Sequence, residues 1–314
     1  MGSHKDGKGD GQKMYHGIIN IYKEAGYTSH DVVAKLRGIL KQKKIGHTGT
    51  LDPAAEGALP VCLGNGTKLC GMLTDEGKEY RAVLQLGCET DTPDMTGSVL
   101  NRKEIKATPE EVQEAVLSFL GGYAQIPPMY SALKVNGKKL YELAREGKVV
   151  ERKPRQIQIY KIEIEEIRLP YVTMLVSCSK GTYIRTLCHD IGQKLDCGGA
   201  MAGLVRTRAG SFRVEEALRL AEVEALRDAG ELEGKILPVD SVFLAYPEVT
   251  VNKQFQKLIE NGNAFYRDMG SMKNGIAPDG QVRVYDEAGR FYGIYQYCSE
   301  QERFIPVKMF RENG

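Results

Sequence analysis

A single aspartate stands in a stretch made mostly of small, apolar and glycyl residues. The segment GHTGTLDPAAEGALPVCLG covers residues 46–64 and places Asp52 between Leu51 and Pro53. A carboxylate is ionised at neutral pH, so Asp52 could act as a nucleophile or a base if a cationic partner keeps it charged in an apolar pocket. The commoner alternative is a turn aspartate before proline, and the neighbouring residues leave both interpretations open.

The glycines near Asp52 do not complete a nucleotide-binding motif. A phosphate-binding loop needs GxxxxGK followed by Ser or Thr, and no window of the segment supplies that pattern. Gly64-Asn65-Gly66 starts a dinucleotide fingerprint, but Leu69 stands where its last glycine belongs. Binding of a nucleotide cofactor therefore has little support.

Length and composition set the limits of the interpretation. The 314 residues are enough for one large domain, or for one large and one small domain. No apolar run reaches the roughly 18 residues of a membrane span, and no signal peptide is recognisable, which predicts a cytoplasmic protein without a membrane partner. The seven cysteines are odd in number and form no CxxC pair, so we expect reduced thiols rather than disulfides or a zinc site.

Local patterns predict the elements that must position Asp52. Thr28 and Asp31 have capping-box spacing and predict a helix from about Ser29 to Gln42. Thr108 precedes Pro109-Glu110-Glu111 and predicts a second helix, with Gly121-Gly122 as its end.

Alternating and helical patterns follow one another without regularity. Residues 80–88 alternate as a strand does, and residues 156–167 and 172–178 predict a strand pair. Residues 181–195 have helical spacing, and the chain beyond about Ala245 predicts a small β-rich module. Because no βαβ alternation appears, we expect an α+β fold.

Five long, ordered blocks carry a resemblance to a known family. Together they cover most of residues 17–240, and the sequence resembles the TruB family of pseudouridine synthases. The blocks are GIINIYKEAGYTSHDVV, GHTGTLDPAAEGALPVCLGNGTK, EYRAVLQLGCETDTPDMTG, QIPPMYSALKVNGKKLYELAREG and CSKGTYIRTLCHDIG.

The resemblance implies a fold and a domain organisation. We expect a pseudouridine synthase fold, in which helices flank a central mixed, mainly antiparallel sheet, and a small β-rich PUA-like domain at the C-terminus. Residues 1–13 would be a disordered leader or an expression remnant, residues 14–244 the catalytic domain with a basic RNA-gripping insertion at about 126–155, and residues 245–314 the PUA-like RNA-binding domain.

The resemblance also implies an activity. The expected enzyme isomerises uridine 55 in the T-loop of tRNA: it breaks the N-glycosidic bond, rotates the base and rejoins it through C5. No metal, no organic cofactor and no protein partner are implied. An RNA-binding chaperone that helps tRNA to fold, with secondary catalysis, and a guide-RNA-dependent pseudouridine synthase are the alternatives.

Three catalytic positions follow from the resemblance. Asp52 matches the catalytic aspartate, which attacks the target nucleotide or, in a competing proposal, abstracts a ribose proton. Tyr80 matches the tyrosine that stacks on the uracil and is placed for proton transfer at C5. Arg185 matches the arginine that pairs with the aspartate, and we expect its guanidinium to hold both carboxylate oxygens through parallel N–H bonds. Without the resemblance, Tyr80 could equally be a core residue and Arg185 a solvated helix residue.

Three further residues are expected at the substrate. His47 matches the histidine that fills the stack vacated by the flipped base, although a lone loop histidine is more often a hydrogen-bonded turn residue. Tyr183 is a candidate for the pocket wall. Lys23 is a substrate-binding candidate in Tyr22-Lys23-Glu24, where the family has a polar residue followed by Lys-Pro.

A basic segment is the expected RNA-binding surface. Residues 134–155 hold eight Lys and Arg and three Glu, a net charge of +5 in a chain whose total is +2. Phosphate contacts from this segment would make tRNA binding depend on salt, whereas a solvated charged surface is the alternative. The candidate tRNA contacts are Lys134, Lys138, Lys139 and Arg152.

Overall fold

The computed structural model describes residues 14–135, 137–272, 275, 277 and 279–310. The predicted leader at residues 1–13 lies outside the described residues. Among the helices of the described chain, none combines the length and the apolar character needed to cross a membrane.

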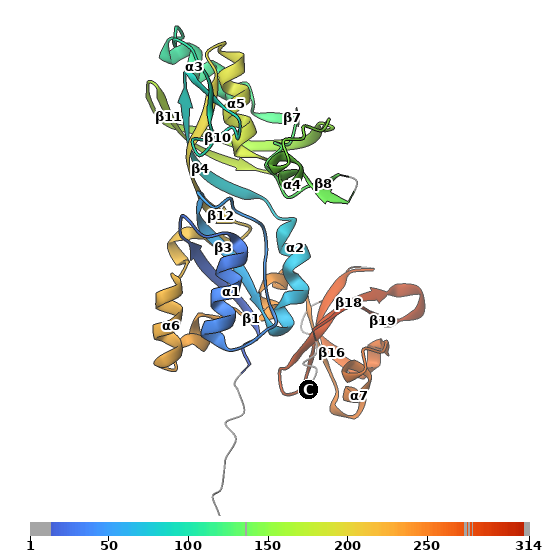
Figure 1. The fold of residues 1–314 in the computed structure, drawn as a ribbon. Helices are drawn as coiled ribbons and strands as arrows, with labels where there is room; N and C mark the ends of the chain where they lie inside the picture. Colours follow the sequence, from blue (N-terminus) through green and yellow to red (C-terminus); the bar gives the residue numbers. More distant parts are fainter. Residues whose placement is uncertain (1–13, 136, 273–274, 276, 278, 311–314) are drawn as a thin grey trace, which may run out of the picture.

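One long sheet of nine strands runs through the larger part of the molecule (Figure 1). All its strand pairs are antiparallel except β3 with β12, so the predicted mixed, mainly antiparallel sheet is confirmed. The main strand order is β1 (Gly17–Lys23), β3 (Glu56–Leu63), β12 (Gly199–Ala209), β4 (Lys78–Leu86), β11 (Tyr171–Cys178), β10 (Arg155–Arg168) and β7 (Gly121–Gln125). Two short strands extend it, β2 (Ile45–His47) on β3 and β13 (Phe212–Arg213) on β12.

Helices lie against both ends of this sheet, and two of them begin as predicted. The capping boxes at Thr28 and Thr108 are both formed. The first predicted helix ends at Leu40 rather than Gln42, because Lys41 takes a left-handed conformation with φ 53°. The second ends before the predicted Gly121, which starts a strand. The helices of this part are α1 (Ser29–Leu40), α2 (Cys70–Thr74), α3 (Pro109–Leu117), α4 (Leu140–Arg145), α5 (Ile184–Lys194) and α6 (Leu220–Asp228).

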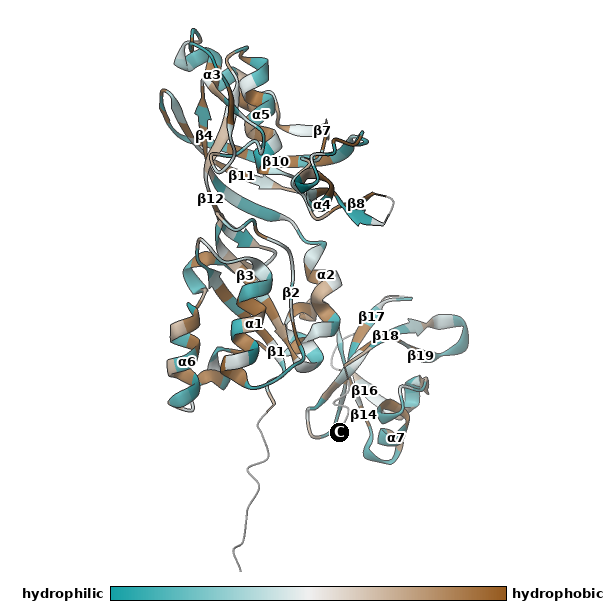
Figure 2. Ribbon diagram, in the orientation of Figure 1, coloured by the Kyte–Doolittle hydropathy of each residue, from teal (hydrophilic) through white to brown (hydrophobic). Residues whose placement is uncertain are grey.

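The apolar residues of the sheet form two main cores. Near one end, α1 packs on β1 and β3 through Leu36, Ile19 and Val61. Near the other end, α5 packs on β12 and β4, and Leu84 and Leu187 are buried in the same core, as the alternation predicted for Leu84. Figure 2 shows the hydrophobic colouring concentrated on β1 and β3 beside α1. The long strands β4 and β12 connect the two cores.

Two small hairpins project from this frame. β5 (Cys88–Thr90) pairs with β6 (Val99–Arg102), and β8 (Lys134–Val135) pairs with β9 (Lys138–Lys139) directly before α4. The second hairpin and α4 belong to the basic segment.

The C-terminal part is β-rich, as predicted. Its six-stranded sheet has its own core, which includes Phe265, Tyr295 and Phe304. Phe243, Phe291 and Phe310 pack together against the larger part. The elements are β14 (Glu248–Val251), α7 (Gln256–Glu260), β15 (Phe265–Tyr266), β16 (Gly270–Met272), β17 (Gln281–Asp286), β18 (Phe291–Cys298) and β19 (Arg303–Met309). The domain boundary between residues 244 and 245 stays a prediction.

Candidate active site

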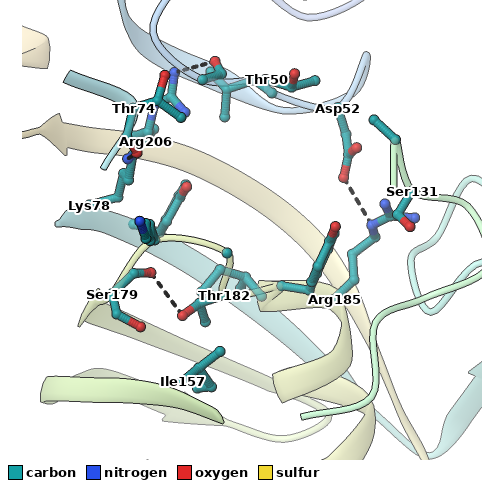
Figure 3. Close-up of a pocket in the computed structure, with 18 of the residues that line it drawn as sticks. Thr50, Asp52, Thr74, Lys78, Ser131, Ile157, Ser179, Thr182, Arg185 and Arg206 are labelled. Carbon is teal, nitrogen blue, oxygen red and sulfur yellow. Dashed lines mark hydrogen bonds and ion pairs between the residues drawn. The ribbon is translucent and has the colours of Figure 1, made fainter. Parts of the chain in front are cut away.

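A cavity of about 590 Å³ lies where the loop after β2, strand β4 and the start of α5 meet. Asp52, Tyr80, Tyr183 and Arg185 all line it. Figure 3 shows Asp52 and Arg185 on one side of the cavity and Lys78 and Arg206 on the other. The fold therefore brings together residues that are far apart in the sequence.

Asp52 and Arg185 form an ion pair. The Nε atom of Arg185 lies 2.9 Å from Oδ2 of Asp52. The Arg185 side chain is 5% exposed and the Asp52 side chain 39% exposed, so the carboxylate faces the cavity and the guanidinium lies behind it. Burial raises the pKa of Asp52 above its ordinary value, whereas the charge of Arg185 acts to lower it.

The guanidinium of Arg185 is shared among several acceptors. Its Nη2 donates to the carbonyl of Tyr130 at 2.7 Å and its Nη1 to the carbonyl of Thr92 at 3.2 Å. The Nη1 atom also lies 3.5 Å from Oδ2 of Asp94. The expected pair of parallel bonds from Arg185 to Asp52 is therefore wrong: one nitrogen contacts the carboxylate, and the other two hold the arginine in place.

Asp94 is a second carboxylate that the sequence analysis did not single out. Its Oδ1 accepts from the backbone N–H of Thr96 at 2.9 Å and from the hydroxyl of Thr92, also at 2.9 Å. Asp94 lies in the block EYRAVLQLGCETDTPDMTG, but no local pattern links it to Arg185. Only the folded chain brings these two residues together.

Tyr80 is buried on β4 and is one of the residues that line the cavity. Burial raises the pKa of its phenol, and the cation of Arg206 opposes the shift. Arg206 is itself buried on β12 and donates to the carbonyls of Ala58 at 2.7 Å and Gly49 at 3.3 Å. Arg206 thus fixes the loop that carries Asp52, a role that the sequence did not indicate.

Lys23 does not take the expected place at the substrate. Its side chain is 0% exposed, and its ammonium donates to the carbonyls of Ala55 at 2.5 Å and Pro53 at 3.2 Å. Burial lowers the pKa of Lys23 to about 8, and the charge of Asp52 acts in the opposite direction. The substrate-binding assignment is therefore corrected: Lys23 is not among the described residues that line the cavity, and it anchors the loop that follows Asp52.

Lys78 is a second buried lysine, and it does line the cavity. It donates to the carbonyls of Thr74 at 2.5 Å and Glu76 at 2.7 Å. Burial, followed by the nearby charge of Arg206, lowers the pKa of Lys78 to about 8.

His47 and Tyr183 have different positions relative to the cavity. His47 is half-buried: its Nδ1 accepts from the N–H of Gly49 at 3.3 Å, and its ring lies 5.8 Å from the ring of His30. His47 is not among the described residues that line the cavity, and it lies two positions before the first of them, Gly49. Tyr183 is one of the lining residues. Burial lowers the pKa of His47, which favours the neutral imidazole.

The basic segment contains exposed cations and cations that contact other groups of the protein. Lys134 is exposed, and Lys138 lies 3.6 Å from a carboxylate oxygen of Glu146. Lys139 donates to the phenol of Tyr141 at 3.2 Å. Arg152 donates to the carbonyl of Pro127 at 3.0 Å, so this side chain supports the segment itself.

The cavity mouth has two basic residues that the sequence analysis missed as site residues. Arg155, at the end of the basic segment, and Lys180, after β11, both line the cavity and are exposed. Taken together, the cavity has the Asp52 carboxylate held by a buried arginine, a buried aromatic side chain and basic residues at its rim, of which Lys180 lies 2.9 Å from a carboxylate oxygen of Asp75. Such a site suits nucleophilic or base chemistry on a substrate that has both a planar ring and phosphate groups.

Two family models match consecutive parts of the chain. The model described as TruB family pseudouridylate synthase (N terminal domain) matches residues 37–184. The model described as tRNA pseudouridylate synthase B C-terminal domain matches residues 185–244.

Proteins named tRNA pseudouridine synthase B are similar over nearly the whole chain. The protein from Lachnoclostridium phytofermentans is 55% identical over 306 residues, which are 94% of this chain and 99% of that protein. The protein from Clostridium kluyveri is 46% identical over 294 residues, with the same coverage of 94% and 99%.

Solved structures share the fold. A chain in the crystal structure of a Cbf5-Nop10-Gar1 complex has a TM-score of 0.69 and 26% identity, with coverage of 94% of this chain and 85% of that chain. A chain in an H/ACA RNP bound to a substrate RNA containing 2'-deoxyuridine has the same TM-score, 0.69, at 24% identity, with coverage of 95% and 86%.

Proposed function

The chain belongs to the TruB family of pseudouridine synthases, and we propose that it converts uridine 55 in the T-loop of tRNA to pseudouridine as a stand-alone enzyme. Pseudouridine synthesis in tRNA is the activity that the names of its relatives give. The choice of uridine 55 and the independence from other molecules are the proposed parts. A tRNA substrate also makes the cytoplasm the proposed location.

The observation that carries the proposal is the ion pair of Asp52 and Arg185 in the wall of a cavity that also contains Tyr80. In the proposed reaction, Asp52 attacks the target nucleotide or abstracts a ribose proton. The N1–C1' bond breaks, the base rotates and a C5–C1' bond forms, while C5 loses a proton and N1 gains one. Substrate and product are isomers, so the reaction needs no second substrate.

Tyr80 and Arg185 have separate roles in this proposal. Tyr80 stacks on the uracil and is placed for the proton transfer at C5, which agrees with its position on β4 among the residues that, like Asp52, line the cavity. Arg185 orients the carboxylate and stabilises its charge in a buried setting. Tyr183 forms part of the wall.

The target uridine has to leave the base stack before it can reach Asp52. Extruding a base costs a few kcal/mol, and a side chain that fills the vacated space reduces this cost. We assign that role to His47, which lies two residues before the cavity-lining Gly49. The neutral form of its imidazole, favoured by burial, suits insertion between bases.

The tRNA is bound by two surfaces in this proposal. Within residues 134–155, Lys134, Lys138 and Lys139 lie at or near the surface and are available for phosphate contacts. The β-rich residues 245–314 are proposed to be a PUA-like RNA-binding domain attached to a catalytic domain of residues 14–244. A substrate grip built into one chain supports action without a guide RNA or a protein partner.

A single reconstitution tests the proposal. The purified protein is incubated with an unmodified tRNA transcript, with no guide RNA and no second protein, and the modified uridines are mapped. We expect pseudouridine at position 55 and none in a matched transcript that carries cytidine there. Product only after addition of a guide RNA would overturn stand-alone action, and tRNA refolding without any product would favour the chaperone alternative.

A further inference from the structure

Gln125 is a buried side chain that ties two distant segments together. It is the last residue of β7 and is 1% exposed. Its Oε1 accepts from the backbone N–H of Tyr183 at 2.7 Å, and its Nε2 donates to the backbone carbonyl of Tyr183 at 3.0 Å. The same Nε2 lies 2.5 Å from the phenol oxygen of Tyr123. Both ends of the amide are therefore satisfied, and both grip the main chain of one residue.

That residue is where α5 begins. Tyr183 is the N-cap of α5, and its own side chain makes no capping hydrogen bond. The first N–H groups of a helix have no partner within the helix, so an outside acceptor fixes the position of the helix start. Gln125 supplies such an acceptor at the N-cap itself and adds a donor for its carbonyl.

Arg185 is only two residues beyond Tyr183. A shift of the helix start would move the Cα of Arg185 with it, and the guanidinium would then leave its position 2.9 Å from the Asp52 carboxylate. Since Arg185 is almost completely buried, its side chain has little freedom to compensate for such a shift. The position of the catalytic pair thus depends on how firmly the start of α5 is held.

The segment that follows Gln125 holds α5 at two more points. The hydroxyl of Thr186 donates to the carbonyl of Ile126 at 3.3 Å, and Nη2 of Arg185 donates to the carbonyl of Tyr130 at 2.7 Å. Those two acceptors are backbone atoms, whereas Gln125 contacts α5 through its side chain, so a substitution of Gln125 alters the attachment without changing a residue of α5.

We propose that Gln125 is a positioning residue for the isomerisation: it acts through the main chain of Tyr183 to hold the start of α5, and hence Arg185, against Asp52. Gln125 does not touch the substrate in this inference, and it is not among the described residues that line the cavity. The inference rests on the proposed function, because it needs the Asp52–Arg185 pair to be the catalytic one.

The test compares Gln125→Met, which keeps the length of the side chain and removes the amide, with wild type and with Gln113→Met. Gln113 is exposed on α3 and controls for the change of residue type. Single-turnover pseudouridine formation, tRNA affinity and thermal unfolding are measured for each protein. We expect the rate of Gln125→Met to fall on the order of a hundredfold, because small displacements of reacting groups have such effects, with tRNA affinity within about twofold of wild type.

A double-mutant cycle separates positioning from a general structural effect. If Gln125 acts through Arg185, the Gln125→Met change should cause little further loss in an Arg185→Lys background. An additive loss there, or a Gln125→Met rate within a few-fold of wild type, would overturn the inference. If Gln125→Met fails to unfold cooperatively, Gln125→Asn replaces it, because that variant keeps the neutral amide on a side chain one carbon shorter, which cannot reach both backbone groups of Tyr183 as Gln125 does. Its rate is expected to lie below that of wild type, and a wild-type rate would equally overturn the inference. Absence of product from the wild-type protein would instead contradict the proposed function.

Discussion

The Nε atom of Arg185 approaches Oδ2 of Asp52 to 2.9 Å from the buried side of the pair, while the carboxylate remains open to the cavity. Arg185 thus engages Oδ2 of Asp52, and the carboxylate is accessible to a substrate from the cavity. The remaining nitrogens of Arg185 are directed at two carbonyls and at Asp94. These other contacts therefore hold the arginine in the position from which it orients the carboxylate.

Asp52→Asn is expected to abolish pseudouridine formation and to leave tRNA binding nearly intact. An amide has the shape of the carboxylate but cannot act as a nucleophile or base, so the single-turnover rate should fall by about a thousandfold or more. Rapid-quench assays and a binding titration measure the two effects. Asp228→Asn, an exposed carboxylate on α6, is the matched control. Turnover by Asp52→Asn within about tenfold of wild type would remove Asp52 from its catalytic role.

Arg185→Lys is expected to be much worse than its conserved charge suggests. Arg185 contacts one carboxylate directly, two carbonyls and a second carboxylate at the same time, and an ammonium on a flexible stem cannot reach all four from one position. Misplacement of the carboxylate should lower the single-turnover rate on the order of a hundredfold with little change in tRNA affinity. A rate within a few-fold of wild type would mean that Arg185 does not position Asp52.

Helix starts and strands that depend on neighbouring residues could be predicted from the sequence. Contacts between residues far apart in the sequence could not. The capping boxes at Thr28 and Thr108 and the alternation in β4 are read from neighbouring residues, and the structure confirms them. The identity of the site residues came from the resemblance, since spacing alone could not relate Asp52 to Arg185. Asp94 and Gln125 each lie in one of the blocks that carry the resemblance. Their contacts with α5, to Arg185 and to Tyr183, join residues far apart in the sequence, and no local pattern points to them.

For Lys23, the sequence suggested a substrate contact that the structure does not support. Its basic side chain suggested a substrate contact. So did its place in Tyr22-Lys23-Glu24, where the sequence departs from the pattern of the family. A lysine in a strand gives no sign in the sequence that its ammonium will be completely buried, because that depends on the carbonyls of a loop 30 residues away. The structure therefore changes the role of Lys23 from binding to support.

The acid limb of the pH–rate profile should report the ionisation of Asp52. Burial raises the pKa of this carboxyl, so its active, charged form is lost at a higher pH than for an ordinary aspartate as the solution is acidified. Arg185 lowers that pKa and Asp94 raises it. The limb should therefore move to higher pH in Arg185→Gln and to lower pH in Asp94→Asn. Single-turnover rates across the acid range measure both shifts, and movement of the two variants in the same direction would contradict the assignment.

Lys23→Met is expected to destabilise the protein and to slow catalysis. The substitution leaves the carbonyls of Glu24, Pro53 and Ala55 without the donor that they share. Hydrogen bonds to a charged donor each contribute about 1.5–3 kcal/mol, but removal of the buried ammonium also removes its desolvation cost. We therefore expect a net loss of roughly 3 kcal/mol in the free energy of unfolding. Urea titration measures this change, with Lys43→Met at an exposed position as the control. Equal stability of the two variants would show that Lys23 does not anchor the loop after Asp52.

The basic segment allows a prediction that separates tRNA contacts from supporting cations. Lys134, Lys138 and Lys153 are exposed, whereas Arg152 donates to the carbonyl of Pro127 and its Nε is buried without a hydrogen-bond partner among the described residues. Replacing the three lysines together by glutamine should weaken tRNA binding and reduce the slope of log affinity against log salt by roughly one for each phosphate that the variant no longer neutralises.

Arg152→Gln should instead lower the thermal midpoint and change the slope by less than one. Lys106→Gln, at an exposed position before α3, is the control. An unchanged slope in the triple variant would place the tRNA grip elsewhere, and a larger slope change in Arg152→Gln than in the triple variant would reverse the roles assigned to these side chains.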